Sequence, residues 1–146
     1  MISRAFVNII VEDLAASRAF YELLGLRVRF DSEWFVHLGA ADNELLELGL
    51  LRRGHSAVHA SVIAEPDGIV LTLVIDDVDE MFRQLTEADA EIVEPPHDMF
   101  YGQRRLLVRG PAGELVDLSS ECEPDPAWLS RVTQREDGAY IETPEN

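Results

Sequence analysis

Two stretches of the chain share one pattern of apolar and polar positions. Each begins with an apolar run that ends in an acidic pair, Glu12-Asp13 in the first stretch and Asp76-Asp77 in the second. The apolar residues after each pair recur at a spacing of three and four, which is typical of a helix with one buried face. Asp13 and Asp77 are expected to be the N-caps, because a short side-chain oxygen can accept a hydrogen bond from a free backbone N–H there. The apolar positions of the two predicted helices are Leu14, Phe20, Tyr21 and Leu24, and Val78, Met81, Phe82 and Leu85.

The pattern is an internal repeat, in which Asp13 aligns with Asp77 at an offset of 64 residues. Gly25 suits the left-handed end of the first helix, and Asp89 stands at the same place in the second. Three β-type runs follow each helix, at about 26–31, 33–39 and 44–51, and at 90–94, 103–109 and 114–119. Glu47 aligns with Asp117 at an offset of 70, so about six extra residues are expected in the loop "EPPHDMFYGQ" (94–103).

These elements predict an α+β fold in which two βαβββ repeats form a curved mixed sheet around a cleft. The predicted domain spans 1–120, with the first copy at 4–52, a linker at 53–68 and the second copy at 69–120. The segment "SAVHASVI" (56–63) is either linker or strand extension. Residues 121–146 form an acidic tail, in which Trp128, Leu129 and Val132 favour one short amphipathic turn that packs on something, such as a partner subunit.

The composition of the chain limits the kinds of chemistry and of binding partner that are expected. The formal net charge is −16 and all 12 basic residues are arginine, which excludes lysine chemistry and disfavours nucleic acid and anionic membranes as partners. The charge either attracts a cationic ligand or serves only solubility. The single cysteine, Cys122, excludes an internal disulfide, and its acidic neighbours oppose a thiolate. No signal peptide or membrane span is recognised, so a cytoplasmic location is expected.

Three segments resemble the glyoxalase / bleomycin resistance / extradiol dioxygenase superfamily, whose fold is the vicinal oxygen chelate fold. They are "VEDLAASRAFYELLGLRV" (11–28), "VIDDVDEMFRQLTEADAEI" (74–92) and "YGQRRLLVRGPAGELVDL" (101–118). Each resembles a family motif, and they occur in the family's order. The resemblance covers residues 4–120 and implies the fold, but the fold hosts isomerases, dioxygenases, transferases and binding proteins.

The metal-dependent members of this superfamily hold a divalent ion with residues from four strands. The resemblance puts Phe6 and Val70 at the two first-strand positions and Glu47 and Asp117 at the two last-strand positions. Phe6 and Val70 cannot bind a metal, and two carboxylates alone do not make a zinc or iron site. No metal and no cofactor is therefore expected, unless histidines such as His37, or His55 and His59 at a helical zinc spacing, converge on the cleft.

The same resemblance implies a cleft lined by aromatic and polar side chains. The residues expected to contact ligand are Phe6, Trp34, Phe35, His37, Glu47, Val70, Phe100, Tyr101, Arg104 and Asp117. Aromatic faces stack on planar or cationic ligands, and the carboxylates favour a cation. A metal-free acid/base role for the Glu47 and Asp117 pair stays open.

The leading hypothesis is a metal-free, homodimeric small-molecule binding protein that resembles bleomycin-resistance proteins and sequesters an aromatic or cationic drug or metabolite. The alternative is a metal-dependent lyase, isomerase or dioxygenase with displaced ligands. A third possibility is an accessory or regulatory binding domain without a role in resistance.

Overall fold

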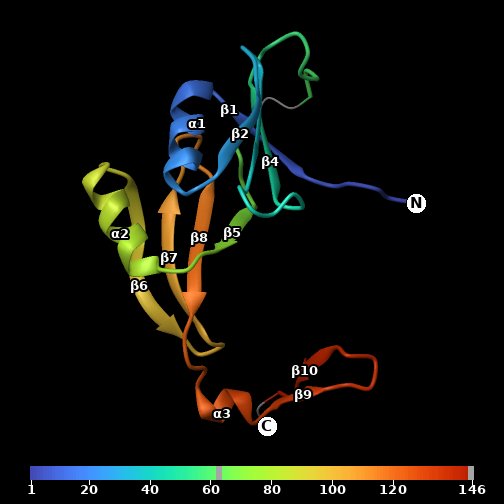
Figure 1. Cartoon of the computed structure of the whole chain (residues 1–146), viewed down its shortest axis with the longest axis vertical. Coiled ribbons are helices and arrows are strands. Elements are labelled where there is room, and N and C mark those ends of the chain that lie inside the picture. Colours follow the sequence, from blue (N-terminus) through green and yellow to red (C-terminus); the bar gives the residue numbers. More distant parts are fainter. Residues whose placement is uncertain (62–63, 145–146) are drawn as a thin grey trace.

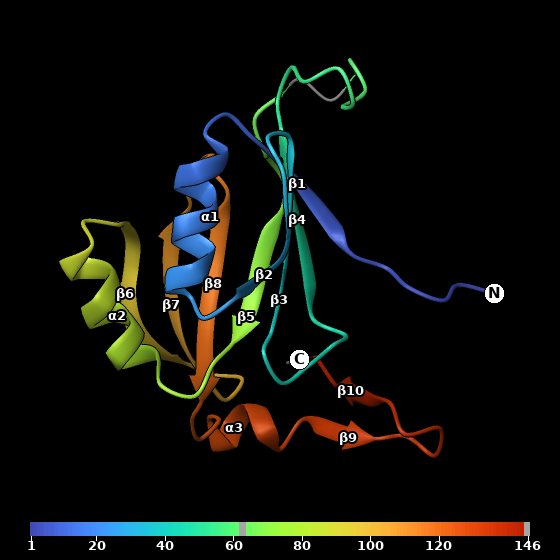
Figure 2. The same cartoon turned by 45° about the horizontal axis from the view of Figure 1, so that its top comes forward.

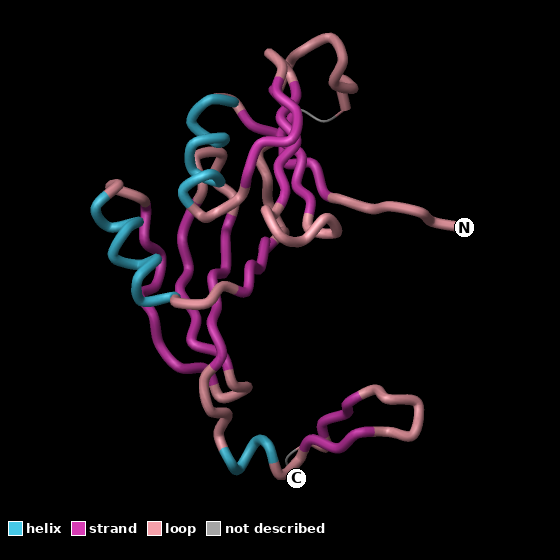
Figure 3. The backbone as a smooth tube through the Cα atoms, viewed as in Figure 1, coloured by secondary structure: helices cyan, strands magenta, loops and turns pink. Residues whose placement is uncertain are grey.

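The computed structural model describes residues 1–61 and 64–144 and contains two βαβββ units followed by a tail (Figure 1). The first unit consists of β1 (Val7–Val11), α1 (Leu14–Leu23), β2 (Arg27–Asp31), β3 (Phe35–Gly39) and β4 (Glu47–Arg52). The second unit consists of β5 (Val70–Val74), α2 (Val78–Glu87), β6 (Glu91–Met99), β7 (Gln103–Arg109) and β8 (Leu115–Glu121). The tail holds α3 (Pro126–Leu129), β9 (Val132–Gln134) and β10 (Tyr140–Glu142). Figure 3 shows the same elements along the backbone.

Each unit forms its own four-stranded mixed sheet. Sheet A has the order β1-β4-β3-β2 and sheet B the order β5-β8-β7-β6, with a parallel first pair and antiparallel pairs after it. The predicted α+β class and both repeats are confirmed, but the strands make two sheets rather than one continuous sheet. In both views α1 lies between sheet A and the β7–β8 part of sheet B (Figures 1 and 2), so a helix separates the two sheets there.

The predicted helix ends are confirmed. The Asp13 side chain accepts a hydrogen bond from the Ala16 backbone N–H at 2.9 Å, and the Asp77 side chain accepts one from Glu80 at 3.0 Å. Gly25 has φ 100°, and Asp89 has φ 53°, so both copies end their helix in the left-handed region. Asp is among the few residues with a side chain that tolerate this conformation, which explains why the second copy ends without glycine.

One core serves both units. Apolar side chains on one face of each sheet and the inner sides of α1 and α2 pack into one cluster. Alternation along a strand sends every second side chain to the opposite face. Leu48 and Leu50 of β4 are buried in the core, whereas Glu47 lies on the other face. The predicted apolar faces of both helices are in or against this core.

A polar contact joins α1 to the second unit inside this core. The Tyr21 hydroxyl donates a hydrogen bond of 3.2 Å to Glu114 Oε1 on the turn before β8, and both residues are buried. Glu114 folds back over Gly110, where any Cβ would overlap the Glu114 carboxylate. Burial raises the pKa of Glu114, and burial together with the Glu114 charge raises the pKa of Tyr21. A neutral hydroxyl and a carboxyl that resists ionisation are therefore held together.

Two segments differ from the sequence-based expectation. The extra residues of the second copy lengthen β6, which runs through Pro95 and Pro96 with two register shifts instead of forming a loop. Proline has no backbone N–H to donate to a neighbouring strand. Because β6 is at the edge of sheet B, prolines on its outer side cost little stability. The tail forms α3 as expected and also an unpredicted hairpin of β9 and β10. No strand is found in the described part of 56–63, and Val62 and Ile63 lie outside the described residues.

Replacing Glu114 with glutamine should reduce the pH dependence of stability. Because the folded-state pKa of Glu114 is raised above the unfolded value of about 4.3, the folded chain keeps this proton to higher pH than the unfolded chain does. The stabilising contribution is complete below the unfolded pKa and is lost as the pH rises through the folded pKa. Urea denaturation between about pH 5 and about pH 8 should therefore show a smaller loss of unfolding free energy for Glu114→Gln than for the wild type.

Glu136→Gln is the matched control, because Glu136 is an exposed residue of the tail. It should follow the wild-type pH dependence. An unchanged pH dependence in Glu114→Gln would show that the buried carboxyl does not titrate differently in the folded chain.

Candidate functional site

The face of sheet A that turns away from α1 carries the candidate site and is called here the open face of sheet A. Val7 pairs with Leu48 and Asn8 with Gly49, so Phe6 and Glu47 lie side by side one residue earlier. The members of this face are Phe6, Asn8 and Ile10 from the first strand, Phe35, His37 and Gly39 from β3, and Glu47, Gly49 and Leu51 from β4.

Aromatic rings cover much of the open face. The His37 ring lies 5.5 Å from Phe6 and 6.3 Å from Phe35, and the second pair is stacked at 11°. Phe35 also contacts Phe30 at 5.9 Å and Trp34 at 5.6 Å, measured between ring centroids. These rings form a continuous apolar floor whose faces are suited to planar or cationic groups.

Glu47 is the carboxylate at one end of this floor, beside Phe6 and His37. Its side chain is only 8% exposed and is surrounded by polar side chains. Arg4 Nε donates to Oε2 at 2.6 Å and Arg4 Nη2 donates to Oε1, so the guanidinium holds the carboxylate through two parallel bonds. His37 Nε2 lies 3.1 Å from Oε1, and Arg29 Nη1 lies 3.6 Å from it. The hydrogen bonds from Arg4 lower the pKa of Glu47, which keeps it ionised at neutral pH.

Arg29 is held in place chiefly by the backbone. Its guanidinium donates to the carbonyl oxygens of Ala40 at 3.0 Å, Asn43 at 3.2 Å and Glu44 at 3.2 Å. It lies flat across Gly39, where a Cβ would overlap it. Arg29 therefore shapes the loop before β4 and contributes a fixed positive charge beside Glu47.

The second carboxylate is not equivalent to the first. Asp117 of β8 pairs with Thr72, whereas Val70 pairs with Leu115. The strand position that corresponds to Glu47 is therefore Leu115, two residues before Asp117, and the offset of 70 drawn from the motifs is wrong for the strand ladder. Asp117 accepts hydrogen bonds from Ser119 Oγ at 2.6 Å and Thr72 Oγ1 at 3.3 Å. It lies on sheet B among hydroxyls, with no arginine among its described hydrogen-bond partners.

The three remaining candidates lie near the β6–β7 turn. Phe100 meets Tyr101 edge-on at 5.3 Å and Trp128 of α3 at 5.8 Å, so this aromatic group anchors the tail. Arg104 points towards α2, where it pairs with Asp79 at 3.0 Å, and it also pairs with Asp98 at 3.0 Å.

The structure thus brings together five of the ten predicted residues. Phe6, Phe35, His37 and Glu47 share the open face of sheet A, and Trp34 contacts Phe35 beside it. Val70 and Asp117 are on sheet B, and Phe100, Tyr101 and Arg104 are at the far turn or against α2.

Three polar residues at this face were left out of the predicted site: Arg4, Asn8 and Arg29. For two of them a signal exists, because Arg4, Phe6 and Asn8 alternate and must share a face if the strand extends backwards. Asn8 lies against Gly49, where a Cβ would overlap its side chain. The position of Arg29 depends on the fold of the 40–46 loop, which periodicity does not encode.

The donors on this face do not fit a catalytic metal. Glu47 and His37 lie together, but zinc and non-haem iron need at least a third protein donor. Among residues 1–61 and 64–144 no three His, Cys, Asp or Glu side chains are arranged to hold a metal. His55 stacks on Trp34, His59 contacts Ser61 and His97 lies beside Glu94. Within the described residues, His37 is the histidine that lies beside Glu47.

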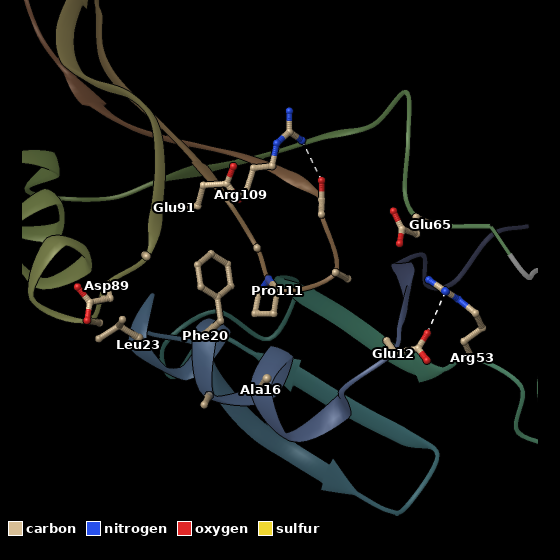
Figure 4. Close-up of a pocket in the computed structure, with 16 residues that line it drawn as sticks. Glu12, Ala16, Phe20, Leu23, Arg53, Glu65, Asp89, Glu91, Arg109 and Pro111 are labelled. Carbon is tan, nitrogen blue, oxygen red and sulfur yellow. Dashed lines mark hydrogen bonds and ion pairs between the residues drawn. The ribbon is translucent and has the colours of Figure 1, made fainter.

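A cavity lies on the other side of the first unit. It measures about 650 Å³ and is bounded by α1, the turn before β6 and the turn before β8 (Figure 4). Phe20, Leu23 and Pro111 line its apolar part, and the Glu12–Arg53 ion pair of 2.9 Å lies at one end. None of the ten predicted residues lines it. None of the helices in the described part of the chain could span a membrane.

The chain resembles several solved structures over most of its length. A bleomycin resistance determinant encoded on the transposon Tn5 is 22% identical, with a TM-score of 0.59, covering 82% of this chain and 98% of that one. A glyoxalase-related enzyme from Fulvimarina pelagi is 17% identical, with a TM-score of 0.68, covering 97% and 98%. A superfamily member from Sphaerobacter thermophilus is 26% identical, with a TM-score of 0.65, covering 83% and 98%.

No curated protein matches the chain. The family model described as "Glyoxalase/Bleomycin resistance protein/Dioxygenase superfamily" matches residues 4–118, which include the first unit, the second unit as far as Leu118 of β8, and all ten predicted site residues. The chain therefore belongs to the glyoxalase / bleomycin resistance protein / dioxygenase superfamily.

Proposed function

We propose that this chain is a metal-free small-molecule binding protein that takes an aromatic or cationic compound on the open face of sheet A. The observation that carries the proposal is a single ionised carboxylate, Glu47, set in a floor of aromatic rings. A floor of this kind attracts a flat cation through ring faces and charge at once. The formal charge of −16 raises the local concentration of cations near the molecule.

The likeness to the Tn5 bleomycin resistance determinant supports a binding role, since that protein is named for resistance to a drug. At 22% identity this likeness extends to the fold alone. The ligand class therefore rests on the side chains of the open face, and the sequestered compound is a drug or a metabolite of matching chemistry.

Binding at this face should raise the melting temperature and should depend on Glu47. A ligand that binds only the folded state stabilises it by about 2.7 kcal/mol at a concentration near one hundred times its Kd. We expect bleomycin or an aromatic cation such as benzyltrimethylammonium to raise the melting temperature in a thermal-shift assay. Glu47→Gln, which removes the charge and keeps the shape, should reduce that shift. Glu136→Gln, an exposed residue of the tail, should leave the shift unchanged.

A screen of aromatic cations without any shift would remove the support for a binding role on this face. The melting-temperature shift could instead persist in Glu47→Gln and disappear in Ala19→Trp, which fills the cavity beside α1. That result would show that the ligand binds in the cavity and not on the open face of sheet A.

The alternative, a metal-dependent lyase, isomerase or dioxygenase, requires a third metal ligand beside Glu47 and His37. We expect purified protein to hold much less than one equivalent of zinc, nickel, iron or manganese after dialysis, by elemental analysis. His37→Ala should leave this content unchanged. Stoichiometric metal that survives dialysis and is lost in His37→Ala would overturn the metal-free proposal.

We also propose that the protein is a homodimer. β1 and β5 are edge strands whose outer edges have no strand partner within the described residues. Both carry exposed apolar side chains, with Val7 52%, Val70 54% and Val74 64% exposed. Unpaired edges that also expose apolar side chains favour association with another chain.

Light scattering with size exclusion at micromolar protein should give twice the chain mass of 16.4 kDa. Val74→Lys should shift the mass towards one chain, because a lysine on an edge strand opposes strand association. Thr86→Lys, on the exposed side of α2, should keep the dimer mass. A wild-type mass of one chain would contradict the dimer.

A further inference from the structure

Arg4 belongs to an arm rather than to the sheet. Residues 1–6 precede β1 and form no helix or strand, and in Figure 2 this segment leads away from sheet A. Met1 and Ile2 are fully or largely exposed, and the Arg4 side chain is 54% exposed. The side-chain contacts of Arg4 with Glu47, His37 and Phe6 are therefore what hold this part of the arm against the sheet.

The groups that surround the Arg4 guanidinium form a complete recognition site for a planar cation. Glu47 accepts its two parallel N–H bonds, and His37 Nε2 lies 3.2 Å from Nη2. The guanidinium carbon lies 4.8 Å from the centroid of the Phe6 ring. Glu47 and His37 are fixed on the central strands β4 and β3, and Phe6, the last arm residue, directly precedes β1, so all three stay in place when Arg4 moves away.

We infer that Arg4 occupies the place of the ligand's cation, and that the ligand of this face is an aromatic compound carrying a guanidinium or amidinium group. The inference rests on the proposed binding function and specifies its ligand. The aromatic part of such a ligand extends from the cation over Phe35 and Trp34, next to His37.

The chemistry of Glu47 selects this cation. With Arg4 in place the Glu47 side chain is 8% exposed and both of its oxygens accept hydrogen bonds, so a competitor of Arg4 must also donate to both oxygens. A planar fork with two parallel N–H groups does this, whereas an ammonium acts as a point charge. Arg29 cannot move in to replace Arg4 without breaking its three bonds to backbone carbonyls.

Competition with an attached group lowers the apparent affinity. Arg4 is held near Glu47 by a chain of a few residues, so its effective concentration there is high. The free ligand binds only the fraction of molecules in which Arg4 is displaced, and its apparent Kd rises in proportion. Removing the competitor should therefore strengthen binding, whereas removing a residue that contacts the ligand would weaken it.

The test is calorimetric titration of the full chain with benzamidine, using the neutral benzamide and the anionic benzoate as shape-matched controls. We expect Arg4→Gln to bind benzamidine on the order of tenfold more tightly than the wild type. Arg4→Lys, which keeps the charge but loses the fork, should lie between the two. Glu47→Gln should lose benzamidine binding, and benzamide and benzoate should not bind. Arg83→Gln, the same change of charge on α2, should match the wild type.

The outcomes separate this inference from the proposed function. Equal or weaker benzamidine binding by Arg4→Gln, with binding still dependent on Glu47, would overturn the role of Arg4 and leave the cation site standing. Preference of wild type and Arg4→Lys for benzoate would overturn both, because the arginines would then be recognising an anion. Folding of each variant is checked by its urea denaturation curve, and Arg4→Lys keeps the test decisive if Arg4→Gln does not fold.

Discussion

The structure depends on the burial of α1 between two sheets. A helix has one apolar stripe, and α1 uses it against sheet A while Tyr21 reaches across to Glu114 of the second unit. Tyr21 is fully buried, and its hydroxyl needs an acceptor there. Glu114 supplies one, and Gly110 leaves the space in which its carboxyl folds back. The two repeats are thus joined by a helix and a polar pair, and not by a shared strand ladder.

This arrangement determines which surfaces are available for ligands. Because both sheets bury the face that meets the helices, their opposite faces carry the remaining side chains. On sheet A these are aromatic rings and one carboxylate, and two glycines let Asn8 and Arg29 lie flat across the strands. On sheet B the corresponding carboxylate, Asp117, is displaced by two positions and meets hydroxyls. The repeats share a backbone plan, but only sheet A combines an ion pair with a ring floor.

Much of the fold could be predicted from the sequence, because it follows from local signals. The caps Asp13 and Asp77, the left-handed residues Gly25 and Asp89, and the apolar spacing of both helices each encode their own structure. About half of the candidate site could be predicted from the sequence. Four residues gather on the open face of sheet A because strand alternation fixes their face, and Trp34 follows through its contact with Phe35. Arg104 instead pairs with Asp79 of α2, and a strand pattern does not predict where that helix packs. The register of Asp117 could not be predicted either, because an alignment of two motifs does not show which residues of two parallel strands pair.

The net charge of the site depends on Arg4, Arg29 and Glu47. A chain with a formal charge of −16 draws cations from solution, yet its best cation site already holds an arginine of the chain. With Arg4 and Arg29 both beside Glu47, the local charge is positive and a free anion meets no strong repulsion. Once Arg4 leaves, Glu47 and Arg29 balance, and the surrounding acidic field then favours an incoming cation. The position of one arm residue therefore decides whether the aromatic floor presents a net positive or a balanced charge, which links ligand choice to a contact only a few residues from the start of β1.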